Sequence, residues 1–257
     1  MSTYLCNACG TQYPPSDEPP ETCPICEDPR QYVPHDTGQV WLPWDEFLDA
    51  HEADVRDDHG ILGIGCTPSF AIGQRALVVD GVLWDCVPYL DDVLAARVGS
   101  LRGIAVSHPH YYSAMADWAE RFDCPIWIHE DDEEWIQQSR GRVELWSGET
   151  KELGGGLTLV RLGGHFAGGQ VLHWAGGAAL LSGDIVQVLP GGRWVSFMYS
   201  YPMLIPLPAR EVEGIAAALE PFAFDRILGA WWDRNVLADG KDVVRRSAER
   251  YVRALSG

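Results

Sequence analysis

The sequence predicts an α+β protein with two β-sheets packed together and helices outside, preceded by a small metal-stabilised module. Three observations support this prediction. Four of the seven cysteines lie within the first 26 residues, in a stretch with almost no apolar side chains between them. From residue 59 onward, two successive halves of the chain each show strand-like runs followed by helix-like runs. Hydrophobic residues make up 46% of the 257 residues, enough to form packed cores.

The N-terminal cysteines form two Cys-x-x-Cys pairs separated by thirteen residues rich in Pro, Asp and Glu. Such a segment has too few apolar residues to fold on a hydrophobic core. Each pair can present two sulfurs to one ion, and structural zinc contributes on the order of 10 kcal/mol to folding. Residues 1–36 are therefore predicted to be a tetrathiolate module, with the ligands Cys6, Cys9, Cys23 and Cys26.

This module resembles the rubredoxin-like domains of rubrerythrins, which join a Cys-x-x-Cys-Gly knuckle to a Cys-Pro-x-Cys knuckle through an acidic, Pro-rich loop. The corresponding stretches here are Cys6 to Gly10 and Cys23 to Cys26. The resemblance leaves the metal open, because tetrathiolate sites take zinc or iron. A zinc ribbon is the first expectation, with a role in stability or in docking a partner protein.

Residues 37–58 are polar and acidic, and are expected to form a linker with one short helix beginning near Pro43 and Asp45. Residues 59–257 are expected to form the large domain. In its first half, apolar runs predict strands at 61–65, 69–73, 76–81, 82–85, 103–107 and 125–129, and helices at 89–98, 114–122 and 131–138.

The second half begins with glycine-rich turns between apolar runs. These runs predict strands at 142–146, 150–153, 157–162, 170–174 and 178–183. Helices are expected at 209–219 and 242–255, with a strand at 225–228 between them. In the last helix, apolar residues from Val243 to Leu255 fall on one face, as expected for a helix that packs on a sheet.

The net charge of −18 excludes several function classes. Nucleic-acid binding depends on Lys and Arg that neutralise phosphates, so a nuclease is disfavoured, as is binding to an anionic membrane surface. No run of about 18 apolar residues is present to span a bilayer. The N-terminal residues lack the basic start and apolar stretch of a secretion signal. A cytoplasmic protein that acts on a small-molecule substrate is expected.

Polar residues follow several apolar runs, at the points where strands are predicted to end. His108 and His110 leave one run in the stretch SHPHYY, His165 lies in a Gly-Gly-His turn, and Asp184 follows LLSG. Side chains at strand ends converge at one edge of a sheet. Three imidazoles and a carboxylate suit zinc or iron and leave room for a water molecule. The sequence therefore predicts a metal site with these four ligands.

Taken in chain order, these residues resemble the metallo-β-lactamase superfamily over nearly all of residues 60–257. The resemblance rests on the strand-end Asp85, the His108-x-His110 loop, the His165 turn and the Ser-Gly-Asp184 strand end. It implies an αββα sandwich with a metal site at one edge, metal-dependent hydrolysis, and a structural role for Asp85.

Two departures from the family pattern concern the second metal. The motif of the family continues His-x-His-x-Asp-His, but Tyr112 and Ser113 occupy its last two positions here. A last histidine, expected after the strand DRILG, is also absent, and Trp231 and Trp232 occupy that neighbourhood. A mononuclear centre is therefore expected.

The predicted activity is hydrolysis of an ester, thioester, lactone or similar bond by one zinc and its bound water. Asp184 would orient that water, and Tyr112 and His129 are candidate proton donors or acceptors. Tyr199, Tyr201, Trp231 and Trp232 are candidate substrate contacts. Two alternatives stay open: a mononuclear iron oxygenase that acts on sulfur compounds, and a metal-binding scaffold without turnover in which the tryptophans close the site.

Overall fold

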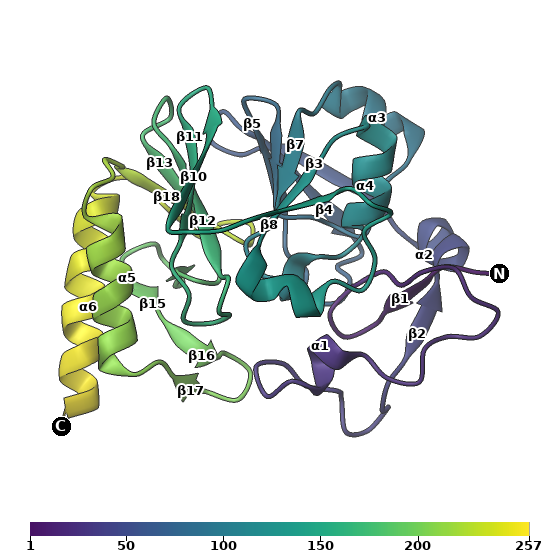
Figure 1. Cartoon of the computed structure of the whole chain (residues 1–257), viewed down its shortest axis with the longest axis horizontal. Helices are drawn as coiled ribbons and strands as arrows, with labels where there is room; N and C mark the ends of the chain where they lie inside the picture. Colours follow the sequence, from purple (N-terminus) through teal and green to yellow (C-terminus); the bar gives the residue numbers. More distant parts are fainter. Residues whose placement is uncertain (257) are drawn as a thin grey trace. The chain divides into compact units, whose positions relative to one another are not determined.

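The computed structural model describes residues 1–256, which divide into two compact units. The first unit comprises residues 1–128 and 133–145. The second comprises residues 129–132 and the chain from residue 146 onward. Each unit contains one large β-sheet with helices along it (Figure 1). Among the described residues, no helix is long and apolar enough to cross a membrane.

The first unit contains a seven-stranded sheet whose strands lie in chain order. Its strands are β3 (Glu52–Asp57), β4 (Leu62–Thr67), β5 (Ala76–Val79), β6 (Val82–Trp84), β7 (Gly103–Ala105), β8 (Ile126–His129) and β9 (Val143–Trp146). Its helices are α3 (Asp92–Val98) and α4 (Met115–Phe122), with the 3₁₀ turn η1 (Pro109–Tyr111). The 3₁₀ turn η2 (Glu130–Trp135) has residues in both units.

The pairing in this sheet follows from the connections. β5 and β6 are joined by Asp80 and Gly81, both with positive φ, and this Asp-Gly turn matches the twist of an antiparallel hairpin. β6, β7 and β8 pair in parallel, so their connections cross over, and α3 and α4 form part of those connections. The parallel pairing also brings the carboxyl ends of β6 and β7 to the same edge of the sheet.

The tetrathiolate segment belongs to the same unit. It contains β1 (Tyr4–Cys6), α1 (Pro24–Glu27) and β2 (Trp41–Pro43), followed by α2 (Trp44–Ala50), and β1 pairs with β2. The short helix expected between residues 37 and 58 is present as α2. However, residues 52–57 are not linker: they form β3, which pairs with β4 over its whole length. The alternating polar residues of this edge strand concealed it in the sequence.

The second unit contains a six-stranded sheet of order β10-β11-β12-β13-β18-β19. Its strands are β10 (Thr150–Gly154), β11 (Leu157–Arg161), β12 (Gln170–Trp174), β13 (Ala179–Gly183), β18 (Arg226–Gly229) and β19 (Asn235–Val236). Two small hairpins precede the helices and comprise β14 (Gln187–Val188), β15 (Val195–Ser196), β16 (Met198–Ser200) and β17 (Ile205–Pro206). The helices are α5 (Ala209–Leu219) and α6 (Gly240–Ser256).

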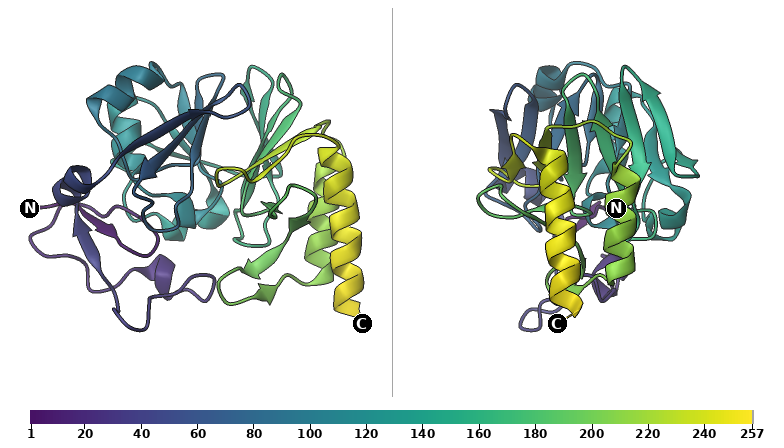
Figure 2. Two further views of the ribbon diagram at one scale, coloured as in Figure 1. Left: turned by 180° about the vertical axis from the view of Figure 1, so that it is seen from behind. Right: turned by 90° about the vertical axis from the view of Figure 1, so that its left-hand side faces the viewer.

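In this unit, α5 and α6 lie side by side along the sheet (Figure 2). Buried residues of both helices, among them Val212 and Val244, join strand residues such as Leu180 and Ile227 in one hydrophobic cluster. β13 and β18 run parallel, and β11 points the same way because it is two antiparallel steps from β13. The segments that follow β11, β13 and β18 therefore leave the same edge of the sheet.

Two predicted elements of the first half take another form. Residues 69–73 are a turn rather than a strand, since Pro68 lacks an N–H to continue a ladder and Gly73 has a positive φ. Residues 131–138 were expected to be a helix, but only the 3₁₀ turn η2 forms there. The acidic run has no apolar stripe that would hold a longer helix on the sheet.

A buried ion pair joins the ends of two strands in the first sheet and allows a test of this arrangement. Asp58 follows β3 and Arg75 precedes β5, with 8% and 1% of their surfaces exposed. Because Asp58→Ala removes the carboxylate that pairs with a buried guanidinium, we expect a loss of roughly 3–5 kcal/mol in the free energy of unfolding, measured by urea denaturation. Adding Arg75→Met should recover most of that loss. A loss below about 1 kcal/mol in the single variant, as for a surface pair, would contradict the prediction.

Candidate metal centres

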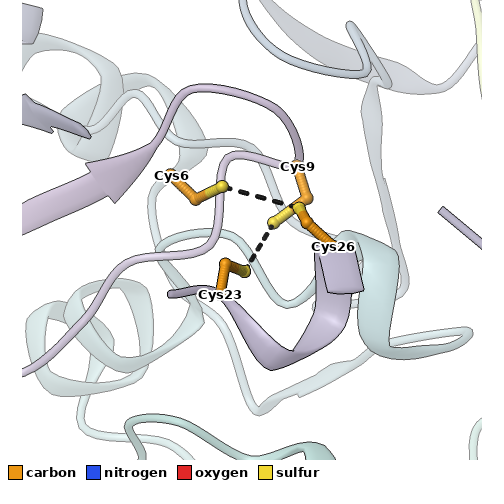
Figure 3. Close-up of side chains that lie close together, drawn as sticks. All are labelled: Cys6, Cys9, Cys23 and Cys26. Atoms are coloured by element: carbon orange, nitrogen blue, oxygen red, sulfur yellow. Dashed lines mark hydrogen bonds between the residues drawn. The ribbon is translucent and has the colours of Figure 1, made fainter. Parts of the chain in front are cut away.

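Four cysteines converge in the N-terminal segment. Cys6 ends β1, Cys9 follows in the next turn, and Cys23 and Cys26 flank the start of α1, with all four sulfurs pointing to one centre (Figure 3). All four side chains are buried, and none forms a disulfide. Their sulfur atoms lie within 4.8 Å of one another. The structure thus contains the tetrathiolate group predicted from the two Cys-x-x-Cys pairs.

The sulfur spacing fits a tetrahedral metal site. Cys6 Sγ is 3.6 Å from Cys26 Sγ, and Cys9 Sγ is 3.7 Å from Cys23 Sγ. In a tetrahedron with metal–sulfur bonds of about 2.3 Å, the sulfurs lie about 3.8 Å apart, whereas a disulfide needs about 2.05 Å. Hydrogen bonding with Cys23 lowers the pKa of Cys6 and raises that of Cys9. Four adjacent thiols therefore need a bound cation before all of them can ionise.

The loop with His108 and His110 is fixed by Asp85, directly after β6. The Asp85 carboxylate accepts a hydrogen bond from the Ser107 N–H at 2.7 Å, and its own N–H donates to the Ala105 carbonyl at 2.8 Å. Asp85 is only 1% exposed and has a positive φ of 59°. It therefore clamps the backbone on both sides of Val106, the structural role that the resemblance implied.

His108 and His110 lie close together at the start of η1. Their ring centroids are 5.1 Å apart, and both rings are buried. Pro109 opens the 3₁₀ turn, which brings the two side chains to the same side of the backbone. Ser107 Oγ lies 2.8 Å from His108 Nδ1, so the Nε2 atom of His108 is the ring nitrogen presented for metal binding.

Tyr112 and Ser113 stand at the positions where the motif that the sequence resembles has an aspartate and a third histidine, and both are buried. Ser113 has a positive φ of 46°, and its carbonyl accepts a hydrogen bond from the Gln12 N–H at 3.0 Å. Neither side chain is a carboxylate or imidazole. The acid–base role of Tyr112 stays a prediction.

His165 lies in the second unit, in the turn that follows β11. Gly163 and Gly164 both have positive φ, and a Cβ on Gly164 would lie 2.8 Å from a methyl group of Leu207. The Nδ1 atom of His165 lies 2.7 Å from the Tyr199 carbonyl, to which it donates its proton. This bond fixes the tautomer in which Nε2 carries the lone pair that a metal needs.

Asp184 directly follows β13 in the same unit. Its carboxylate accepts a hydrogen bond from Gln187 Nε2 at 3.1 Å, and its backbone carbonyl accepts one from the Tyr201 hydroxyl at 3.0 Å. The Tyr201 ring also packs edge-on against His165, with centroids 5.7 Å apart. Burial raises the pKa of Tyr201 well above its usual value, so its hydroxyl stays protonated as a donor. Tyr201 thus supports two of the predicted ligands.

The four predicted ligands form a group that can hold a metal ion. The donor atoms of His108, His110, His165 and Asp184 lie within 4.8 Å of one another, and all four side chains are buried. Three neutral imidazoles and one carboxylate are the ligand set that zinc and iron share. The donor chemistry and the fixed His165 tautomer therefore fit a bound divalent cation.

His129 is buried and engaged at both ring nitrogens. Its Nδ1 atom accepts a hydrogen bond from the Asp131 N–H at 3.2 Å, and its Nε2 atom lies 3.1 Å from the Gly148 carbonyl. The ring also packs edge-on against Trp146. Backbone groups thus engage both ring nitrogens at the end of β8, and the acid–base role of His129 stays a prediction.

The four candidate substrate contacts divide into two pairs. The Tyr199 carbonyl and the Tyr201 hydroxyl bond to His165 and to the Asp184 backbone, so both tyrosines support the ligands. Trp231 and Trp232 are half-buried and line a cavity of about 380 Å³ in the second unit. Gln187, Val188, Pro190 and Arg234 complete its lining.

Two supporting residues were not identified from the sequence. Asp132 lies in the acidic run of η2, yet it is buried and accepts a hydrogen bond from the Gly168 N–H at 2.7 Å, in the turn that holds His165. Gln187 orients Asp184 from β14, a two-residue strand. No local signal separates such residues from surface polar residues, because their partners are distant in the sequence or held by tertiary packing.

The comparisons with known proteins give one relative of full length. The chain is 44% identical over 270 aligned residues to the uncharacterized protein YmaE of Bacillus subtilis (strain 168), and the match covers 100% of this chain and 98% of that protein. No family model matches the chain.

Similar solved structures include metallo-β-lactamases. DIM-1 superposes with a TM-score of 0.57 at 13% identity, covering 79% of this chain and 98% of that one. FIM-1 from Pseudomonas aeruginosa, in a mono-zinc form, gives a TM-score of 0.55 at 14% identity, covering 77% and 95%. At these identities the likeness concerns the fold, and it confirms the predicted αββα class.

The tetrathiolate geometry predicts how loss of one sulfur affects the N-terminal segment. Cys9→Ser should lower the metal content of purified protein by about one equivalent and destabilise the segment by several kcal/mol, because metal binding supplies most of its folding free energy. Metal analysis and denaturant unfolding provide the measurements. The matched control is Cys124→Ser, a buried cysteine outside the group. An unchanged metal content in Cys9→Ser would contradict the assignment.

Proposed function

We propose that this chain, which belongs to the family of YmaE of Bacillus subtilis and has the metallo-β-lactamase fold, is a metal-dependent hydrolase with a mononuclear centre. The observation that carries the proposal is the group of four buried donors from His108, His110, His165 and Asp184. A zinc ion bound there would polarise a substrate carbonyl and lower the pKa of a water molecule to about 7.

The protein contributes fixed geometry around that group. Ser107 and the Tyr199 carbonyl each engage an Nδ1 atom, so His108 and His165 are oriented without the metal. Gln187 donates a hydrogen bond to one oxygen of the Asp184 carboxylate, and this bond restricts rotation of the carboxylate. Prepositioned ligands of this kind lose little freedom when the metal binds.

A single ion is favoured by the residues that follow the histidine pair. Tyr112 and Ser113 offer a phenol and a hydroxyl where the family pattern has a carboxylate and an imidazole, and both are buried. Such groups are weak ligands for a second zinc ion. The substrate class that suits one ion contains an activated acyl bond, as in an ester, a thioester or a lactone, because the leaving group then needs no second cation.

The cavity lined by Gln187, Trp231 and Trp232 favours an enzyme over an inactive scaffold. The scaffold alternative expects Trp231 and Trp232 to close the site, but both tryptophans line an open cavity of about 380 Å³ that also includes Gln187, the hydrogen-bond partner of Asp184. Arg234 adds a positive charge to two aromatic walls. An acyl substrate with an apolar or aromatic body and an anionic group matches that lining.

Loss of one histidine tests the hydrolase proposal. His110→Ala should remove about one equivalent of metal and lower kcat/KM at least about 100-fold on the best of a panel of thioesters, lactones and phosphodiesters, since the ion loses a ligand. The control is His173→Gln, at a buried histidine whose ring bonds to the Ala223 carbonyl. Full turnover in His110→Ala would overturn the proposal.

The same preparation separates zinc from iron. Protein reconstituted with zinc alone should hydrolyse its substrate without dioxygen. If turnover required iron and consumed dioxygen with a thiol or persulfide substrate, the oxygenase alternative would replace the hydrolase.

The cavity predicts a change in KM. Trp231→Ala should raise KM about tenfold with a smaller effect on kcat, because the tryptophan provides apolar contact area to bound substrate. Arg234→Gln should raise KM for an anionic substrate but not for its neutral analogue. Steady-state kinetics measures both effects, with Trp194→Ala as the control, since Trp194 stacks with Arg250 instead. An effect confined to kcat would contradict the placement of substrate in this cavity.

A further inference from the structure

Gln12 joins the tetrathiolate segment to the histidine loop. Gln12 is buried, with 2% of its surface exposed, although a glutamine is usually exposed. Its N–H donates to the Ser113 carbonyl at 3.0 Å, three residues after His110. Its side-chain Nε2 donates to the Asp117 carboxylate at 2.7 Å, in the first turn of α4. Gln12 therefore contacts the chain on both sides of the point where the loop becomes helix, through the Ser113 carbonyl and the Asp117 carboxylate.

The side-chain oxygen of Gln12 is engaged as well. Gln138 donates to Gln12 Oε1 at 2.9 Å, and both residues are buried. These two side-chain hydrogen bonds, to Asp117 and from Gln138, hold the amide in a single orientation. Removing the amide would leave the buried Gln138 donor and Asp117 acceptor each short of one bond.

The neighbours of Gln12 face the sulfurs. The Thr11 hydroxyl lies 3.2 Å from Cys9 Sγ, and the Tyr13 hydroxyl donates to Cys23 Sγ at 3.2 Å. Along extended backbone, successive side chains point to opposite sides, so residues 11 and 13 face the tetrathiolate centre while residue 12 faces the loop. One short stretch of backbone, residues 11–13, therefore links the arrangement of the four cysteine sulfurs to the orientation of Gln12.

We propose that Gln12 is a positioning residue through which the tetrathiolate centre fixes the loop with His108 and His110, so that metal at the cysteines strengthens metal binding at the histidines. The inference rests on the proposed metal site at those histidines. It gives the N-terminal segment a role that requires neither electron transfer nor a partner protein. Oxidation of the cysteines or loss of their metal would then loosen the histidine loop.

The direct test is Gln12→Met in the full chain, which keeps the backbone N–H and similar bulk but removes both side-chain hydrogen bonds. Amide hydrogen exchange over residues 107–116 should accelerate about tenfold, and the dissociation constant of Co²⁺ at the histidine site should rise about tenfold, as expected for loss of one or two buried hydrogen bonds. The d–d spectrum of that Co²⁺ should shift, while the thiolate–cobalt absorption of the cysteine site stays unchanged.

The control variant is Gln39→Met. Gln39 Nε2 donates to Cys6 Sγ at 3.3 Å, so this change also removes a hydrogen bond to the tetrathiolate centre. Gln39 Nε2 also donates to the Val40 carbonyl, which lies outside the histidine loop. Loop exchange and Co²⁺ affinity at the histidines should stay within about twofold of the parent protein. Equal effects in both variants would mean a general loss of stability and would overturn the specific role of Gln12.

A paired substitution supplies the rescue. Gln12→Glu alone places a second carboxylate against Asp117 and should loosen the loop as Gln12→Met does. Adding Asp117→Asn restores a donor opposite an acceptor and should recover slow exchange and the parent cobalt spectrum. Because Asp117 also pairs with Arg140, recovery in the pair is measured against Asp117→Asn alone. Unchanged exchange in Gln12→Met, or faster exchange in the pair than in Asp117→Asn alone, overturns the inference. Because exchange is measured without substrate, an inactive protein would overturn the hydrolase proposal and leave this test intact.

Discussion

Two histidines one residue apart can serve one metal ion only when the backbone between their strand and their turn is fixed, and Asp85 provides that constraint. Its carboxylate accepts from Ser107 and its N–H donates to Ala105, so the chain leaves β7 in one conformation. The parallel pairing of β6 and β7 makes this possible, because it brings the ends of both strands to one edge. In the second unit, the Tyr199 carbonyl and the Tyr201 hydroxyl act similarly on His165 and Asp184. Three of the predicted ligands, His108, His165 and Asp184, are thus oriented by hydrogen bonds within the protein.

The sequence predicted the parts that local patterns determine. Cys-x-x-Cys pairs, His-x-His after a buried strand, and Ser-Gly-Asp at a strand end identified both metal-binding groups, and α5 begins and ends where apolar periodicity and Pro208 indicate. It did not reveal β3, an edge strand rich in charged residues, or the hairpins around Met198. Asp132, Gln187 and Gln12 were also missed. Each is a polar residue whose role depends on a partner that the fold brings near, and Asp132 and Gln12 are buried. No residue pattern identifies such a partner.

The acidic character of the chain is consistent with where its cations would bind. The chain has 37 acidic and 19 basic residues, so its net negative charge repels phosphate backbones. Its surface carboxylates are not part of either candidate metal site. Both sites are buried and consist mostly of imidazoles or thiolates. The tetrathiolate centre orders a segment with little hydrophobic core, and Gln12 links that order to the histidine loop. The second metal position of the family pattern is replaced by Tyr112 and Ser113, and the Ser113 carbonyl bonds to Gln12. Ser113, which replaces the last histidine of the His-x-His-x-Asp-His motif, is thus also a residue that the N-terminal segment contacts.

Anomalous diffraction from crystals of the metal-loaded protein, recorded at the zinc and iron absorption edges, measures the central claim most directly. The account predicts one peak bound by His108, His110, His165 and Asp184, and a separate peak among the four cysteine sulfurs. Two neighbouring peaks at the histidines, or a fully loaded cysteine centre with no ion at the histidines, would contradict it.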